Sequence, residues 1–453
     1  MLPPGPKGLP IFGSLFAFTR DMPGFLVGLN ESYGSLASFR VGRRPVINLA
    51  EPELIGKVLV DDADSFIKSY GLQRAKVVLG EGLLTSEGEF HLRQRRLSSK
   101  AFLKKRIDAY ADTMVSFTQR HAGEWREGQT IDLAHHMMEL TLRIVSKTLF
   151  DTDSATDVRT VGEAMTALQE LFPWLLTPYT RVLEKLPVPG TLRFRRARAG
   201  LDSVIYRILA ERRANPEDRG DLLSMLMLAT DDEGDGSRMS DLQLRDEVLT
   251  IFLAGHETTA TALAWTGYLL CLHPHHYARL LAEVDDVLRG RAARAEDYGR
   301  LEYTRQVVAE SMRLYPPAWG MGRMATRDYP LGDYVLPAGG TVLASPFVLG
   351  RDARFFPEPL VFDPSRFSAE QEKARPRHVY FPFGAGKRKC LGERFAWMEA
   401  VLVLATLSQQ WRFHYDRGAP VRYRAAVTLR PHPQVPVRLS RRETVSTSSN
   451  TTA

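Results

Sequence analysis

The alternation of apolar and polar residues predicts a small β portion near the start of the chain and helices over most of the remainder. Residues 36–49 alternate around Gly42, which predicts a β-hairpin. Residues 105–230 repeat apolar positions at helical spacing, with prolines separating successive amphipathic helices. Residues 334–345 indicate strands that complete the small sheet. The pattern therefore predicts a mainly α fold with a minor β portion.

One predicted helix is unusually long. Ser240 and Gln243 have the spacing of a capping box, and the helix that they open continues until Pro274. About 34 residues of helix would extend about 50 Å, enough to cross the whole domain. Residues 254–259, Ala-Gly-His-Glu-Thr-Thr, interrupt its apolar run with a glycine and two β-branched threonines. Such local conflicts often mark functional sites.

The residue types in this interruption suit the approach of a small ligand and the transfer of protons. Gly255 would let a diatomic ligand approach the helix, and the Thr258 hydroxyl beside the Glu257 carboxylate could relay protons. A purely structural role is the alternative, and it stays open for the neighbouring threonines 259 and 261. A transmembrane helix is disfavoured because Glu257, with His256 beside it, would be costly in a membrane.

A glycine-rich loop presents one of only two cysteines directly before another apolar helix. Residues 381–394 read Phe-Pro-Phe-Gly-Ala-Gly-Lys-Arg-Lys-Cys-Leu-Gly-Glu-Arg. The glycines at 384, 386 and 392 let the backbone approach a flat ligand closely. The helix start and the basic residues 387–389 are expected to favour a thiolate at Cys390, and the basic residues could bind carboxylates at a porphyrin edge. We interpret Cys390 as the metal ligand of a haem-thiolate site.

Other interpretations of these glycine-rich stretches are weaker. A phosphate-binding loop would need a glycine where Phe381 stands and a serine or threonine where Arg388 stands. A structural core cysteine seldom lies among three cations and two glycines, and a nucleophilic cysteine would need a partner histidine that the sequence cannot place in space. Residues 320–325 fit a dinucleotide fingerprint, but they follow a helix and two prolines instead of a first strand.

The loop resembles a known family. The pattern Phe383-x-x-Gly386-x-Arg388-x-Cys390-x-Gly392 matches the haem-loop signature of the cytochrome P-450 monooxygenases at every defining position. The resemblance covers about residues 3–440 and is closest in kind to soluble bacterial members. It implies one large helical domain over residues 1–440 that encloses haem b, with Cys390 as the axial iron ligand. A disordered tail is expected over residues 441–453, whose end is polar and aperiodic.

The resemblance also implies roles for other positions. Glu257 and Thr258 match the acid–alcohol pair over the distal haem face. His91 and Arg95 lie one turn apart on a basic helix and suit an anionic propionate, although a solvated basic face is the alternative. Further cofactor-binding positions are expected at Ala254, Gly255, Arg323, Phe383, Gly384, Arg388 and Gly392, with Phe383 beside the sulfur and Arg323 and Arg388 at the propionates.

Three charged residues are expected to have a structural role. Glu310 and Arg313 lie one turn apart on a predicted helix over residues 301–315 and can form an ion pair. Such pairs are common on solvated helix faces, so the spacing alone is weak evidence. The family adds an arginine, here Arg366, to make a buried triad.

Net charge and composition limit the classes of binding partner that we expect. The chain of 453 residues has a net charge of +7, and its basic residues gather at 93–96, 100, 104–106 and around Cys390. No zinc spacing or aromatic RNA-binding signature accompanies them, so we expect no nucleic acid. The family resemblance favours an acidic ferredoxin or flavodoxin with its reductase, supplied by NAD(P)H. Two cysteines and a proline-rich start without a long apolar run favour a cytoplasmic monomer without a membrane anchor.

The expected activity is insertion of one oxygen atom from O2 into a C–H or C=C bond of a hydrophobic small molecule. The apolar residues 165–205 and 317–319 suggest a terpenoid, carotenoid, fatty acid or macrolide-like substrate, although they equally fit core packing. A peroxide-driven peroxygenase is a close alternative, but such relatives tend to lack the Glu-Thr pair. A haem-thiolate sensor without turnover is an alternative from another class.

Overall fold

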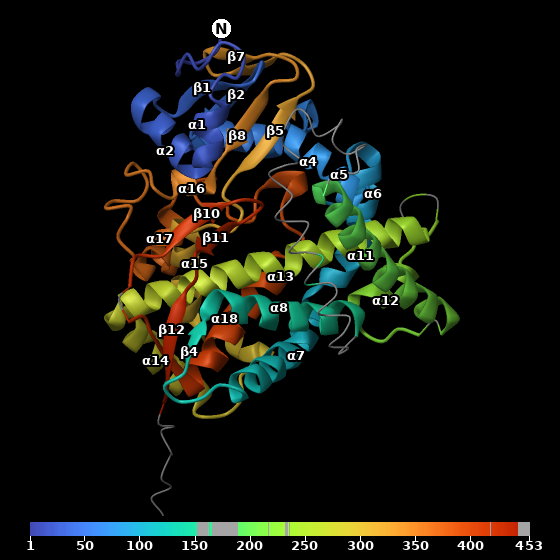
Figure 1. The fold of residues 1–453 in the computed structure, drawn as a ribbon, viewed down its shortest axis with the longest axis vertical. Coiled ribbons are helices and arrows are strands. Elements are labelled where there is room, and N and C mark those ends of the chain that lie inside the picture. Colours follow the sequence, from blue (N-terminus) through green and yellow to red (C-terminus); the bar gives the residue numbers. More distant parts are fainter. Residues whose placement is uncertain are drawn as a thin grey trace, which may run out of the picture.

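The computed structural model describes residues 1–151, 162, 164, 189–215, 217–231, 234, 236–416 and 418–442. Helices form the larger part, and the main sheet lies at the end that carries the N-terminus (Figure 1). The longer helices are α2 (Met22–Tyr33), α6 (Gly88–Ser99), α7 (Lys104–Gly123), α8 (Leu133–Phe150), α11 (Pro189–Ala214), α13 (Asp241–Leu272), α14 (Pro274–Leu288), α15 (Glu302–Leu314) and α18 (Glu393–Gln410).

Short helical segments connect these elements. The short α-helices are α1 (Leu15–Arg20), α3 (Pro52–Gly56), α4 (Tyr70–Arg74), α5 (Lys76–Leu79), α12 (Leu222–Leu228), α16 (Pro346–Leu349) and α17 (Ala369–Ala374). A π-helix follows α3 at Lys57–Asp61, and 3-10 turns lie at Ala63–Ser65, Lys100–Phe102, Ala295–Gly299, Pro364–Phe367 and Gly386–Arg388.

The main sheet joins segments far apart in the sequence. Its strand order is β1 (Leu36–Val41), β2 (Arg44–Leu49), β8 (Thr341–Ala344), β5 (Met321–Ala325) and β3 (Phe66–Lys68). The β1–β2 pair is antiparallel and turns at Gly42 with φ +61, which confirms the predicted hairpin. Of the strands predicted over residues 334–345, β8 joins this sheet and pairs in parallel with β2. Residues 334–336 instead form part of a separate two-stranded sheet, so the prediction that they complete the main sheet is wrong.

Three smaller sheets complete the β portion. One contains β4 (Thr130–Asp132), β12 (Pro436–Arg441) and β9 (Trp411–His414) in that order. The other two are the hairpins β6 (Tyr329–Leu331) with β7 (Tyr334–Leu336), and β10 (Arg422–Ala425) with β11 (Leu429–His432). Of the apolar residues 165–205, residues 189–205 lie in α11, whereas residues 165–188 lie outside the described residues.

Helix α13 crosses the molecule, as its sequence predicts (Figure 1). Ser240 caps it: Gln243 N–H donates to Ser240 Oγ at 3.2 Å, and Ser240 N–H donates to Gln243 Oε1 at 2.8 Å. The helix ends at Leu272, before Pro274. It packs against α8, α15, α18 and α11, and most of its side chains are buried. The apolar core around α13 is accompanied by a second apolar core, which includes side chains of the main sheet.

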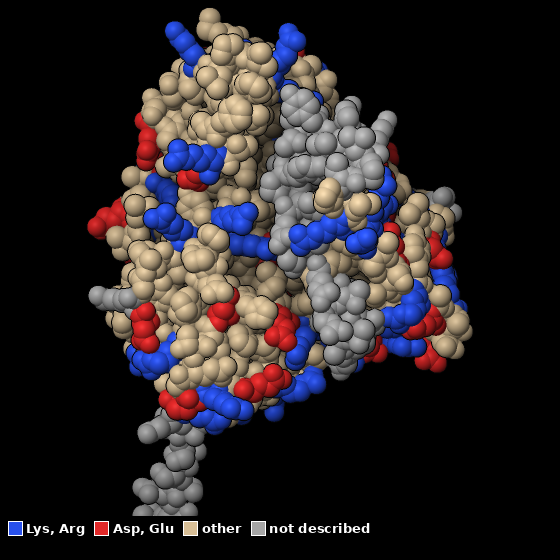
Figure 2. All heavy atoms as spheres, in the orientation of Figure 1, with Lys and Arg blue, Asp and Glu red and all other residues tan. Residues whose placement is uncertain are grey.

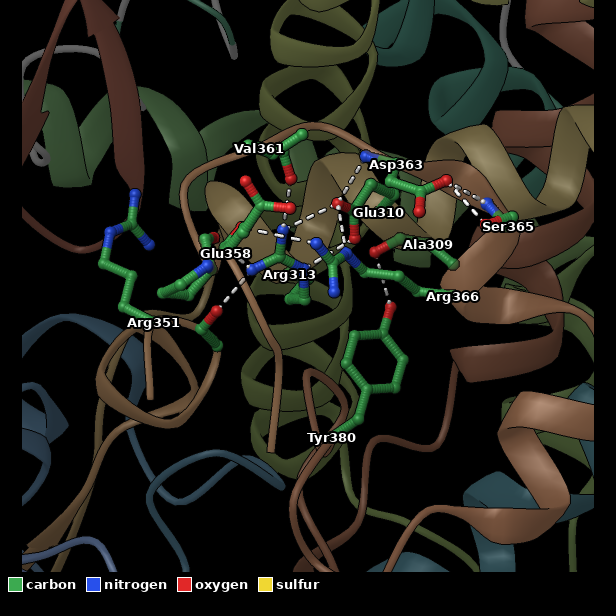
Figure 3. A network of polar contacts seen from close by, with 12 residues as sticks. Ala309, Glu310, Arg313, Arg351, Glu358, Val361, Asp363, Ser365, Arg366 and Tyr380 are labelled. Carbon is green, nitrogen blue, oxygen red and sulfur yellow. Dashed lines mark hydrogen bonds and ion pairs between the residues drawn. The ribbon is translucent and has the colours of Figure 1, made fainter. Parts of the chain in front are cut away.

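The three charged residues expected as a triad come together, with two of them on α15 and Arg366 reaching them from a later segment (Figure 3). Arg313 donates to both carboxylate oxygens of Glu310 at 2.6 Å, and both side chains are fully buried. Arg366 Nε lies 3.6 Å from Glu310 Oε1. Arg313 also donates to the backbone carbonyl of Val361 at 3.1 Å, and Asp363 N–H donates to Glu310 at 2.9 Å. The network therefore fastens α15 to the chain around residues 350–366.

We expect Glu310→Gln to lower the free energy of unfolding by about 3–5 kcal/mol, because it leaves the buried Arg313 without its counter-ion. Urea unfolding of the purified protein measures this change. Glu372→Gln is the matched control. Glu372 also pairs with an arginine of α15, Arg305, at 2.9 Å, but its side chain is about one-third exposed. Its loss should cost less than about 1 kcal/mol. Equal losses in both variants would contradict the role of the buried network.

Candidate functional site

The glycine-rich loop over residues 381–392 passes close to another part of the backbone before it enters α18. Gly384 and Gly386 have φ of +73 and +64, in the region that favours glycine. A Cβ atom at Gly386 would lie 2.1 Å from the carbonyl oxygen of Leu59 in the π-helix. The loop can therefore lie against this segment only because residue 386 has no side chain.

A backbone hydrogen bond fixes the position of Cys390 on this loop. Its N–H donates to the carbonyl of Phe383 at 2.8 Å. The Phe383 ring packs against Trp397 of α18, with 5.7 Å between ring centroids. The side chain of Cys390 is exposed, immediately before the first turn of α18. The loop thus presents a sulfur atom from a well-anchored backbone.

The ionisation of Cys390 differs from the expectation. Burial of the loop raises the pKa of the Cys390 thiol, while the Gly392 N–H, Arg95 and Lys389 act in the opposite direction. Cys390 is exposed as a residue, while the protein atoms around its thiol desolvate it. The three basic residues expected to favour the thiolate each have a carboxylate partner: Lys387 with Asp64 at 2.7 Å, Lys389 with Glu393 at 2.5 Å, and Arg388 with Glu87.

This difference has a chemical consequence. The positive charge near the sulfur is partly neutralised, so the expected preference for a thiolate is outweighed by burial. A metal ion that binds Cys390 must therefore displace the thiol proton.

Basic side chains from four separate segments gather beside the loop. Strands β3 and β5 place Lys68 opposite Arg323 in register. Burial, followed by the charge of Arg388, lowers the pKa of Lys68 to about 7 and that of Arg323 to about 10. Glu87 is the carboxylate within this cluster, where it pairs with Arg388. The excess of positive charge makes the cluster a strong site for an anion.

His91 faces the same cluster from α6. The side chain is buried, and its Nδ1 lies 3.2 Å from Ser86 Oγ. Burial, then the charges of Arg388 and Lys68, lower the pKa of His91 to about 3, so the ring is neutral. The Lys387 carbonyl opposes this decrease, but the buried Nε2 forms no hydrogen bond within the described part of the chain. A neutral ring that accepts from Ser86 would present an Nε2–H donor to an anion.

The sequence analysis missed two residues of this cluster, Lys68 and Glu87. Lys68 donates to the carbonyls of Leu83 and Ser86 at 2.8 and 2.7 Å, and Arg388 donates to the Ser86 carbonyl at 2.9 Å. Glu87 accepts from the Lys68 backbone at 2.7 Å. No local pattern marks Lys68 or Glu87, because their partners are distant in the sequence. The predicted Arg95 donates to the Lys389 carbonyl at 2.8 Å and so ties α6 to the loop.

The middle of α13 is open on one side. Ala254 is exposed although buried residues precede and follow it along the helix. The Thr258 hydroxyl donates to the Ala254 carbonyl at 2.7 Å. Gly255 faces α8: an added Cβ atom would lie 3.3 Å from a methyl group of Val145. The glycine therefore allows close packing of α13 on α8, which the sequence analysis did not anticipate.

Glu257 is held by residues of the β10–β11 hairpin. It is buried, and its Oε1 accepts from Thr428 Oγ1 at 2.6 Å and from Arg430 Nε at 2.7 Å. Arg430 NH2 lies 2.6 Å from the same oxygen. The acid and the alcohol of the predicted pair thus have different hydrogen-bond partners. Arg430 and Thr428 are further site residues that sequence reasoning missed.

Another buried carboxyl group lies on α18. Glu399 is fully buried, and neither oxygen has a hydrogen bond of normal geometry among the described residues. Burial raises its pKa to about 8, and the Thr259 hydroxyl of α13 acts in the opposite direction. The available sequence signal was a single glutamate within the apolar run of residues 395–407. At neutral pH this group is mostly protonated.

Comparisons with known proteins identify the family. The Cytochrome P450 family model matches residues 3–441. Cyclooctatin synthase of Streptomyces melanosporofaciens is 40% identical, covering 94% of this chain and 93% of its own length. Pentalenene oxygenase of Streptomyces avermitilis is 33% identical, covering 96% and 97%. A retinoic acid-bound cyanobacterial P450 structure superposes with a TM-score of 0.87 at 26% identity, covering 97% of this chain and 99% of its own.

The chain belongs to the cytochrome P450 family and has its fold. It is an oxidoreductase of the monooxygenase class, which uses haem iron and molecular oxygen with electrons from redox partners to oxidise hydrophobic substrates. Among the described residues, none of the helices combines the length and the apolar character that a membrane span requires.

The residues present fit a haem group. The exposed Cys390 offers an iron ligand. Nε2 of His91, which has no hydrogen-bond partner among the described residues, lies in a cluster with excess positive charge. Such a cluster suits the two carboxylates at a porphyrin edge. The residues that would hold these carboxylates are His91, Arg95, Arg323, Arg388 and Lys68.

We expect the free energy of unfolding to depend on pH through the ionisation of the buried Glu399. Its pKa is about 8 in the folded protein against an ordinary value of 4.5, so the folded state retains a proton between these values. The free energy of unfolding should therefore fall as pH rises from 4.5 through 8. Glu399→Gln removes this loss, and its advantage over the natural protein should grow by a few kcal/mol between about pH 5 and pH 8.5.

Urea unfolding across this pH range measures the effect, with the exposed Glu302→Gln as control. An advantage that does not change with pH would show that Glu399 is ionised in the folded state.

Proposed function

We propose that this protein is a haem b-dependent monooxygenase that inserts one oxygen atom into a C–H or C=C bond of an apolar, terpenoid-type molecule. The observation that carries the proposal is the accessible Cys390 sulfur on a loop beside a buried excess of positive charge. Bound haem supplies the activation of O2. The protein supplies the ligand sulfur, the carboxylate-binding cluster and the control of protons.

Glu257 and Thr258 are the proposed proton-handling residues. Arg430 and Thr428 hold the Glu257 carboxylate away from the axis of α13, toward the β10–β11 hairpin. A carboxyl group in this position must first take up a proton, and it can pass that proton to the Thr258 side of the helix when its bond to Arg430 rearranges. Arg430 is therefore proposed as a positioning residue that sets the timing of proton delivery.

The substrate class rests on the relatives and on apolar residues near the β10–β11 hairpin. Similar proteins are named for cyclooctatin, cyclooctat-9-en-7-ol and pentalenene, which favours a terpenoid over the other expected substrate classes. Trp319 is mostly buried and donates to the Ala426 carbonyl at 3.2 Å, and Leu429 N–H donates to the Pro317 carbonyl at 3.1 Å. These contacts anchor the apolar segment 317–319 to the hairpin that also holds Glu257.

We propose an acidic ferredoxin or flavodoxin as the electron donor, with NAD(P)H as the source, and a cytoplasmic monomer as the working form. Many of the expected basic residues pair with acidic residues within the chain. Basic and acidic side chains are also interspersed on the face that Figure 2 shows. The internal pairs are Arg93 and Arg96 with Asp231, Lys104 with Asp108, and Arg106 with Asp218. Exposed positions that support the docking proposal are Lys100, Lys105 and Arg394.

We expect Cys390→Ser to abolish the strongly red-shifted carbon-monoxide band of the reduced, haem-loaded protein, because a serine oxygen cannot replace the thiolate ligand. Cys271→Ser is the matched control. Cys271 is the other cysteine, and burial raises the pKa of its thiol to about 12. The control should keep the band and product formation with NAD(P)H and surrogate redox partners. Retention of the band in Cys390→Ser would remove the ligand assignment.

We expect Arg430→Gln and Thr258→Ala to release several-fold more peroxide per NAD(P)H consumed. A buried carboxylate without its cation favours the neutral form, and loss of the hydroxyl removes the relay. Arg424→Gln is the control, because Arg424 faces Arg430 in the β10–β11 register but is exposed. Unchanged coupling in both variants would mean that protons reach the oxygen by another route. Product formation with peroxide alone would favour the peroxygenase alternative.

A further inference from the structure

A second group of potential metal ligands lies between α7 and α8, on elements that contribute none of the proposed haem-binding residues. His121, His136 and Glu139 each offer one ligand atom, and these atoms all lie within 4.8 Å of one another. His121 belongs to the last turn of α7, and the other two belong to α8. The two helices pack against each other, so residues distant in the sequence meet here (Figure 1).

The local sequence places two of these ligands side by side. His136 and Glu139 are three residues apart on α8, so their side chains emerge from the same helical face. His121 Nε2 lies 3.0 Å from His136 Nδ1. Two nitrogen ligands of a tetrahedral Zn²⁺ ion, each about 2.0–2.1 Å from the metal, lie about 3.3 Å apart. The observed separation of the nitrogens is thus close to the one that a metal ion requires.

Both imidazoles are withdrawn from bulk solvent, since His121 is buried and His136 is half-buried. An imidazole binds a metal ion through the lone pair of a ring nitrogen. Arg143 NH2 donates to Glu139 Oε1 at 2.7 Å and orients the carboxylate beside them.

A purely structural histidine pair explains this cluster less completely. His136 Nδ1 accepts a hydrogen bond from Trp125 Nε1–H at 3.3 Å and lies 3.0 Å from His121 Nε2. If His121 donates through Nε2, its Nδ1 carries a lone pair, and this buried atom has no partner among the described residues. Metal binding would exchange the bond between the imidazoles, and the Trp125 bond to His136, for stronger metal–nitrogen bonds.

We propose that His121, His136 and Glu139 bind one divalent transition-metal ion, with Zn²⁺ as the best match, and that a water molecule completes a four-coordinate site. Two imidazoles and a carboxylate are a ligand set that Zn²⁺ commonly accepts. The ion would join the end of α7 to α8, which in turn packs along α13. Its role is to stabilise this helix pair, and it does not depend on the proposed reaction.

The test uses the full-length, haem-loaded protein and Zn²⁺ alone as the probe. After equilibrium dialysis, elemental analysis should find one Zn²⁺ per chain in the natural protein. His136→Gln and Glu139→Gln should each weaken binding at least about tenfold. His135→Gln is the matched control, because His135 is the exposed neighbour of His136 on α8 and should bind Zn²⁺ normally.

Two further measurements separate a true site from surface binding. Zn²⁺ should raise the unfolding midpoint of the natural protein and of His135→Gln, but not that of the other two variants. Crystals grown with Zn²⁺ should give an anomalous peak between His121 and His136. The proposal is overturned if the natural protein binds no Zn²⁺, if all variants bind it equally, or if the peak lies elsewhere. The carbon-monoxide spectrum checks that each variant is folded and haem-loaded.

Discussion

Helix α13 lies in the centre of the core and also forms one wall of the site. The elements that pack around it are arranged to satisfy both roles. Its side chains are buried from Leu244 to Phe252 and again from Thr259 to Leu270, with the accessible Ala254 between these runs. Polar groups in such a helix need partners from elsewhere in the fold. Arg245 finds Asp202 at 2.5 Å, and Glu257 finds the β10–β11 hairpin. The helix therefore places the elements that surround the site.

The sequence was sufficient where a local pattern and a local structure coincide. The capping box at Ser240, the hairpin at Gly42 and the glycine loop before α18 each depend on residues within a few positions of one another. The three-residue spacing of Glu310 and Arg313 was also local. The third member of their network, Arg366, needed the family resemblance, because no spacing rule connects it to α15.

Local reasoning failed where contacts join distant segments. The charge around Cys390 was misjudged because Asp64 and Glu87, which neutralise Lys387 and Arg388, precede the loop by about three hundred residues. Lys68 and Arg430 were missed for the same reason, since each becomes informative only beside its partner. A pKa that is shifted by burial likewise cannot be foreseen before the fold is known, as Glu399 shows.

The strand order of the main sheet bears on how the protein is made. Strand β2 lies between β1, its immediate neighbour in sequence, and β8, which begins at Thr341. During synthesis, one edge of the early hairpin therefore has no partner until most of the polypeptide has left the ribosome. Pairings between such distant segments form slowly, and open strand edges are prone to association with other chains. Chaperone supply during expression should consequently influence the yield of folded protein.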